Sequence, residues 1–256
     1  MTLEACTELV RSGDPDRFGA VLVARPEDRP SLITLYALNL EIARAPFQSS
    51  EPMLAEMRLQ WWIDRLAEMG MGKPPPLHDV LTPLWEVWGK DAGFAVPLAE
   101  ARRRDCEREP LAGPDAVVDY VNDTAGQLMG LAAERLGTPA EARGVVADQA
   151  LGAGLAAWLR ALPRLQPWGL GLAHARPEDA IALAGIAQDT LHRAARSRRL
   201  LPRRATGALY PGPNVPQFLN GVLKGNINCF AQVPDITPFQ RQASLAWLAL
   251  TGRWWR

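Results

Sequence analysis

The sequence predicts an all-α protein, and three observations support this fold class. Of its 256 residues, 48% are hydrophobic and 22% are charged, which is the composition of a globular chain. Residues that start and stop helices flank apolar residues at helical spacing along most of the chain, and sustained alternation of β-branched and polar residues is missing. A chain of this length buries about three quarters of its unfolded surface. We therefore expect a single domain over residues 1–256.

The clearest predicted helix covers residues 51–69. Ser50 stands at the position of an N-cap, Pro52 lies in the first turn and Gly70 follows the last turn. The apolar residues of this segment form two faces, one with Leu54, Met57 and Trp61 and the other with Leu59, Trp62, Ile63 and Leu66. Two apolar faces predict burial on more than one side.

The same reasoning places the other helices. They are predicted at residues 31–45, 81–88, 114–136, 139–162, 179–196 and 238–250. Thr237 and Gln240 match a capping box at the start of the last of them. Proline-rich breaks at residues 73–76 and 202–216 predict loops.

Charge and cysteine content restrict the class of function. The formal net charge is zero, which gives no indication of a nucleic-acid partner. The charges are unevenly distributed, however: from Thr190 onward the sequence has ten basic residues and one acidic residue, Asp235. Either an arginine-rich gene composition or a basic contact surface accounts for this imbalance. Three widely separated cysteines without a C-x-x-C motif favour neither disulfides nor zinc. No signal peptide and no run of about 18 apolar residues is evident, so we expect a cytoplasmic protein with at most peripheral contact at the inner membrane face.

Motifs for nucleotide binding or hydrolase chemistry are missing, and the three histidines show no metal-ligand spacing. Carboxylates remain the route to chemistry in a helical chain, and Asp115, Asp119 and Asp123 recur at intervals of one turn. The simpler interpretation is that all three are solvated near a helix N-terminus.

Specific strings resemble the squalene/phytoene synthase family over about residues 14–165. They are Asp16-Arg-Phe18, residues 31–44, the Arg-Leu-Gln-Trp-Trp-Ile-Asp run of residues 58–64, Tyr120 with Thr124-Ala-Gly126 and Gly130, and Leu151-Gly152. The resemblance implies an isoprenoid synthase-type helical bundle around a central apolar cavity. Active members condense two prenyl diphosphates with Mg²⁺ held by two aspartate-rich segments.

Both acidic segments are replaced in this chain. Ala43, Arg44 and Phe47 stand where the first is expected, and Ala161 and Pro163 interrupt the second. Metal charge contributes several kcal/mol to ionisation of a diphosphate, so these replacements disfavour catalysis. Without these aspartates we expect no metal and no cofactor; Mg²⁺ would be needed only by an active enzyme.

The matching segments carry the candidate ligand-binding residues. These are Tyr36, Asn39, Arg44, Gln60, Asp64, Tyr120, Asp123, Gln127 and Arg160. The two arginines are suited to pairing with a phosphate. For Gln60 and Asp64 the simpler alternative is a hydrogen-bonded pair on a helix surface, and for the Trp61–Trp62 pair it is core packing.

The resemblance is strongest to a divergent branch of the family that includes an assembly factor of respiratory complex I. The first hypothesis is therefore a non-catalytic protein that binds a prenyl or lipid-like ligand, or that assists respiratory-complex assembly through a protein partner. The second is an active head-to-head prenyltransferase using Asp119 and Asp123, with Glu41 opposite them. The third is a scaffold without a ligand.

The C-terminal end combines apolar, aromatic and basic residues. Leu245, Trp247, Leu248 and Leu250 precede Arg253-Trp-Trp-Arg256. We expect this segment to dock on the bundle, with an interfacial membrane helix as the alternative. The arginines of residues 193–204 are compatible with peripheral membrane attachment.

Overall fold

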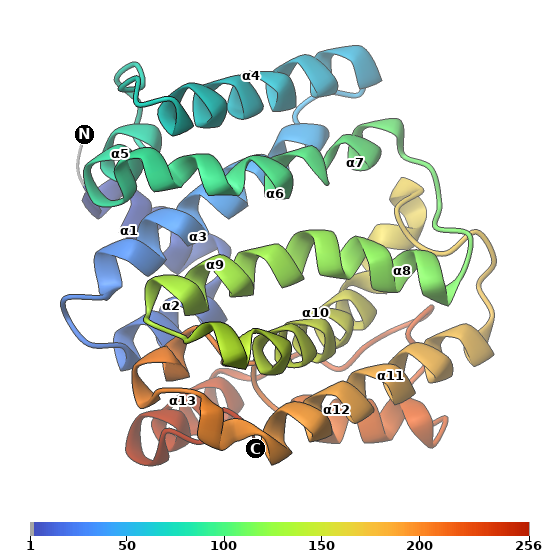
Figure 1. Cartoon of the computed structure of the whole chain (residues 1–256). Helices are drawn as coiled ribbons and strands as arrows, with labels where there is room; N and C mark the ends of the chain where they lie inside the picture. Colours follow the sequence, from blue (N-terminus) through green and yellow to red (C-terminus); the bar gives the residue numbers. More distant parts are fainter. Residues whose placement is uncertain (1–2, 256) are drawn as a thin grey trace. The chain divides into compact units, whose positions relative to one another are not determined.

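The computed structural model describes residues 3–255 (Figure 1). No β-strand occurs in these residues, although Leu111 and Leu172 form a parallel bridge. The all-α prediction is confirmed. The internal contacts divide the chain into two compact units, Met1–Glu107 and Arg108–Arg256, and the expectation of a single domain stays a prediction.

The first unit is built around α3. Its elements are α1 (Leu3–Gly13), α2 (Pro15–Val23), α3 (Arg29–Arg44), η1 (Ala45–Phe47), α4 (Pro52–Gly70), α5 (Leu81–Trp88), η2 (Gly89–Ala95), α6 (Val96–Glu100) and α7 (Arg103–Glu107). From Ser31 to Asn39 every residue of α3 is buried, because this helix packs against α1, α2 and α5. The Trp88 indole on α5 donates a hydrogen bond to Thr34 Oγ1 at 3.2 Å.

The second unit is built around α10, which packs against α8, α9, α11 and α12 (Figure 1). Its elements are α8 (Pro114–Val121), η3 (Asn122–Gly126), α9 (Gln127–Arg135), η4 (Ala140–Ala142), α10 (Arg143–Leu165), η5 (Gln166–Trp168), α11 (Pro177–Arg196), η6 (Arg198–Leu200), η7 (Arg203–Gly207), α12 (Val215–Leu223) and α13 (Pro238–Thr251). Twelve residues of α10 are buried, mainly alanine, glycine, leucine and valine. Small side chains allow the neighbouring helices to approach closely.

Helix α4 differs from its prediction in two ways. Its N-cap is Glu51, without a side-chain hydrogen bond, rather than Ser50. The face with Leu59 and Leu66 is buried, but Met57 is 62% exposed and Trp61 38% exposed. The prediction that this helix is buried on more than one side is therefore wrong. Apolar spacing shows where a helix could pack, but not whether the fold supplies a second neighbour.

The predicted helix of residues 114–136 contains an interruption. Residues Asn122–Gly126 form a π-helical turn between α8 and α9, and Thr124 Oγ1 donates to the Tyr120 carbonyl at 2.7 Å. A π-turn widens a helix locally and often occurs at functional positions. The helix then ends before Gly137, whose φ of +82° is readily adopted by glycine.

The predicted loop of residues 202–216 was partly wrong. It contains the short helix η7, and Pro216 lies in the first turn of α12. Proline marks a loop or the first turn of a helix equally well, because the N–H groups of that turn have no partner within the helix.

The capping box at α13 is confirmed and gives a direct prediction. The backbone N–H of Gln240 donates to Thr237 Oγ1 at 3.2 Å, and the backbone N–H of Thr237 donates to Gln240 Oε1 at 3.0 Å. Thr237→Ala should lower the free energy of unfolding by about 1 kcal/mol in urea titrations, since one backbone donor loses its partner. Thr237→Ser keeps the hydroxyl and should remain near wild type; equal losses in both variants would contradict the capping role.

Candidate functional site

The candidate residues fall into two groups, one in each unit. Tyr36, Asn39 and Arg44 lie on α3, with Gln60 and Asp64 on α4. Tyr120 lies near the end of α8, Asp123 in η3, Gln127 at the start of α9 and Arg160 on α10.

Tyr36 and Asn39 are buried polar residues, one helical turn apart. They are 3% and 8% exposed. The Arg17 guanidinium lies over the Tyr36 ring, 5.7 Å from its centroid, and donates to Asp14 Oδ2 at 2.6 Å. Arg17 belongs to the Asp16-Arg-Phe18 string that resembles the family, but its contact with Tyr36 joins two helices, which sequence spacing does not reveal.

The electrostatics of this group keep the phenol neutral. Burial raises the pKa of Tyr36 to about 12, with the Asp14 charge adding to the rise and the Arg17 charge opposing it. Burial by itself lowers the pKa of Arg17, but the charge and hydrogen bond of Asp14 outweigh it and the pKa lies above its ordinary value. The phenol of Tyr36 therefore keeps its proton to a higher pH than an exposed tyrosine does.

Arg44 lies in the last turn of α3, where a cation interacts favourably with the helix dipole. Its side chain is 46% exposed and its Nη1 is 3.9 Å from Glu41 Oε1. The guanidinium also borders Gly13 on α1, where an added Cβ would lie 2.8 Å from Nη2. An exposed cation therefore occupies the segment in which the resemblance implies carboxylates.

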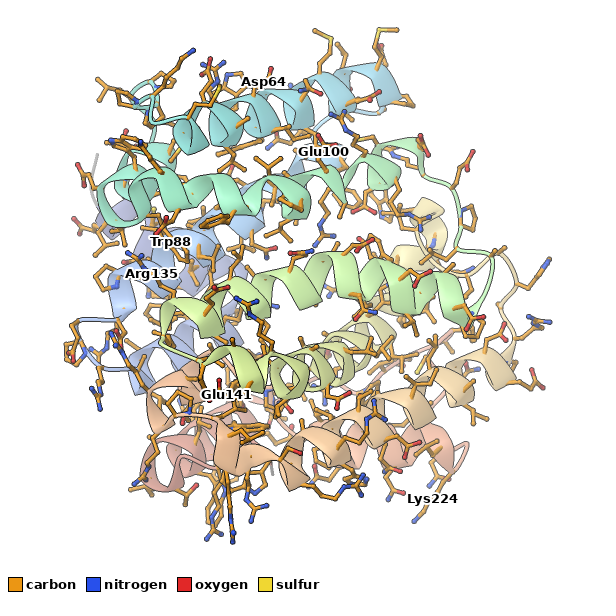
Figure 2. The ribbon with its side chains drawn as sticks, viewed as in Figure 1. Asp64, Trp88, Glu100, Arg135, Glu141 and Lys224 are labelled. Carbon is orange, nitrogen blue, oxygen red and sulfur yellow. The ribbon has the colours of Figure 1, made fainter. Side chains whose placement is uncertain are left out.

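Gln60 and Asp64 form the helix-surface pair that was the simpler alternative for them. Gln60 Nε2 donates to Asp64 Oδ1 at 2.6 Å. Arg103 on α7 donates to Gln60 Oε1 and, at 3.1 Å, to Glu56 Oε1. Asp64 on α4 and Glu100 on α6, which also accepts a hydrogen bond from Arg103, are labelled in Figure 2. This arrangement links α4 to α6 and α7 within the first unit.

In the second unit, a pocket of about 370 Å³ lies along η3, α9 and the start of α10. Its polar lining residues are Asn122, Gln127, Glu134, Thr138 and Arg143. The Thr138 hydroxyl oxygen is buried without a hydrogen-bond partner in the described part of the chain. Gly130 also lines the pocket, and an added Cβ there would meet no atom within 4 Å. Of the candidate residues of this unit, Gln127 alone is among those that line the pocket.

Asp115, Asp119 and Asp123 are all exposed. The solvated interpretation of these three carboxylates therefore fits their surroundings. Among residues 3–255, no group of three histidine, cysteine, aspartate or glutamate side chains could hold a metal ion. The expectation of no metal stays a prediction.

Arg160 holds the chain that precedes α12. Its Nη2 donates to the Pro213 carbonyl at 2.9 Å and to the Asn214 carbonyl at 3.2 Å, and its guanidinium lies 4.6 Å from the centroid of the Phe218 ring. These contacts join residues more than 50 positions apart, which sequence spacing does not reveal. They give Arg160 a role in positioning α12.

The family and the fold follow from comparison with known proteins. The chain matches the family described as squalene/phytoene synthase over residues 10–209 and belongs to this family. A crystal structure of a dehydrosqualene synthase in complex with ligand superposes with a TM-score of 0.78 at 13% identity, covering 95% of this chain and 94% of the other. The predicted isoprenoid synthase-type fold is confirmed.

Curated relatives point to a particular branch of the family. The mouse protein named NADH dehydrogenase (ubiquinone) complex I, assembly factor 6, is 26% identical over 135 residues, and the human protein of the same name is 24% identical. The match covers 52% of this chain and 40% of each relative. In the described residues, no helix is both long and apolar enough to cross a membrane.

Proposed function

We propose that this chain is a non-catalytic member of the squalene/phytoene synthase family that assists assembly of a respiratory complex, with a prenyl or lipid-like ligand as the molecule its fold would bind. The observation that carries the proposal is the sequence similarity to complex I assembly factor 6 in mouse and human. Its partner would be a subunit or intermediate of that complex.

The residues at the ends of two helices support the absence of prenyl transfer. Helix α3 ends in Ala43 and Arg44, and Arg44 is an exposed cation. On α10, Ala161 and Pro163 follow Arg160, whose guanidinium is bonded to backbone carbonyls. Ionisation of a prenyl diphosphate needs clustered carboxylates to hold metal charge, and these segments offer none.

The test is incubation of the purified chain with Mg²⁺ and farnesyl or geranylgeranyl diphosphate, followed by organic extraction and chromatography. We expect no condensed product beyond a boiled-protein control, with an active squalene or phytoene synthase as positive control. Product formation that Asp119→Asn with Asp123→Asn abolishes would establish the prenyltransferase alternative and overturn this proposal.

The assembly role has its own test in cells of the source organism. Deleting the gene should lower the NADH:quinone oxidoreductase activity of isolated membranes and leave succinate oxidation unchanged, and the wild-type gene should restore it. Unchanged NADH oxidation would count against assembly.

We also propose a cytoplasmic location with peripheral attachment at the inner membrane face, supported by the basic C-terminal end of the chain.

A further inference from the structure

Two segments of the second unit that are distant in sequence form one basic surface. The Arg198 guanidinium lies over the Trp255 ring, 5.2 Å from its centroid. Arg203 lies beside Gly252, where an added Cβ would be 3.6 Å from its Nη2. The end of α11, η6 and η7 therefore adjoin the residues that follow α13. We define the basic surface by five of the arginines that these segments carry: Arg196, Arg198, Arg199, Arg203 and Arg253.

Four of these guanidinium groups are available to a ligand. The side chains of Arg196, Arg199, Arg203 and Arg253 belong to exposed residues, and their guanidinium groups make no hydrogen bond or ion pair with any residue from 3 to 255. No acidic residue occurs in the sequence between Asp189 and Asp235. Unpartnered cations on one surface repel one another, so an anionic partner would stabilise this surface.

Exposed apolar side chains accompany the charges. Leu200, in η6 between two of the arginines, is 49% exposed. Leu250, two residues before Gly252, is 83% exposed, and Trp247 on α13 is 44% exposed. Leu248 and Trp254 are buried, so the C-terminal segment docks on its unit, as expected. The same segment leaves the side chains of Trp247 and Leu250 exposed. Arg256 of the predicted segment lies outside the described residues.

We propose that the basic surface binds the headgroups of anionic phospholipids. Arginine pairs with phosphate, while leucine and tryptophan side chains enter the boundary between headgroups and acyl chains. A nucleic acid would use the same arginines but would leave the exposed leucines in contact with water. This inference rests on the peripheral attachment proposed above and names the surface that provides it.

The experiment is sedimentation of the full chain with vesicles of phosphatidylcholine, alone or mixed with phosphatidylglycerol. Wild type should bind the mixed vesicles and be released in part by salt, because the charges are exposed. Replacing Arg196, Arg199, Arg203 and Arg253 with glutamine should reduce the partition coefficient more than about 100-fold, since each arginine near an anionic surface contributes about a factor of five. Leu200→Ser with Leu250→Ser should weaken the binding that remains at high salt.

A matched control separates this surface from net charge. It carries four arginine-to-glutamine changes at other exposed positions: Arg11, Arg25, Arg58 and Arg164. This control should bind the mixed vesicles within a few-fold of wild type, with circular dichroism verifying that every variant is folded. Equal loss in both quadruple variants, no binding by wild type, or displacement from vesicles by duplex DNA would overturn the inference. If wild type does not bind vesicles but the gene still supports NADH oxidation in cells, the proposed lipid-binding surface is refuted and the assembly role is not. If NADH oxidation stays normal after gene deletion, the assembly role is refuted and the lipid-binding surface is not.

Discussion

The free energy of unfolding is expected to fall by several kcal/mol as the pH rises from about 9 to about 12. Burial raises the pKa of the thiols of Cys6, Cys106 and Cys229 from 9.0 to about 11, and that of Tyr36 from 10.0 to about 12. The unfolded chain therefore loses these protons before the native chain does. The stabilising contribution of these groups is fully present below the pKa values of the unfolded chain. It is lost as the pH rises through the pKa values of the folded chain. Each shift corresponds to about 3 kcal/mol.

Urea titrations in reductant at several pH values between about 8 and 11 would measure this loss. Cys6 is a suitable probe because it is 0% exposed. Cys6→Ala should be somewhat less stable at neutral pH, since it leaves a small cavity, but its stability should fall less steeply with pH. A wild-type free energy that stays constant to pH 11, or an unchanged slope in the variant, would contradict burial as the source.

Local signals explain the parts of the fold that were predictable from the sequence. The predicted helix at residues 81–88 coincides with α5, because Gly89 adopts a φ of +54° and ends the helix. The Thr237 capping box is equally local, involving residues three apart. Such features depend on neighbours within one turn, which the sequence displays directly.

Burial and long-range contact were harder to predict. Leu59 and Met57 on α4 are both apolar, but only the presence of packing partners in the fold decides that Leu59 is buried and Met57 exposed. The candidate site shows the same division. The Gln60–Asp64 hydrogen bond follows from i, i+4 spacing, whereas the contacts of Arg160 with Pro213 and Asn214 arise only when the chain folds back.

Gly152→Ala should lower the free energy of unfolding by about 1 to 3 kcal/mol, although alanine favours helix formation. Gly152 lies on α10 where it crosses α11. An added Cβ would stand 2.5 Å from Leu191 Cγ, 2.7 Å from Thr190 Oγ1 and 2.8 Å from the Ala187 carbonyl oxygen. The two side chains have some freedom to move, but the backbone oxygen does not, so the helices must separate.

Gly144→Ala is the matched control, because it is on the same helix and an added Cβ there would meet nothing within 4 Å. It should raise stability by about 0.5 to 1 kcal/mol, which isolates the steric effect at Gly152 from helix propensity. Similar urea midpoints for the two variants would show that α10 and α11 tolerate separation. Gly152 belongs to the Leu151-Gly152 string that resembles the family. If the free energy of unfolding falls in Gly152→Ala and rises in Gly144→Ala, the glycine of that string serves the close crossing of two helices rather than chemistry.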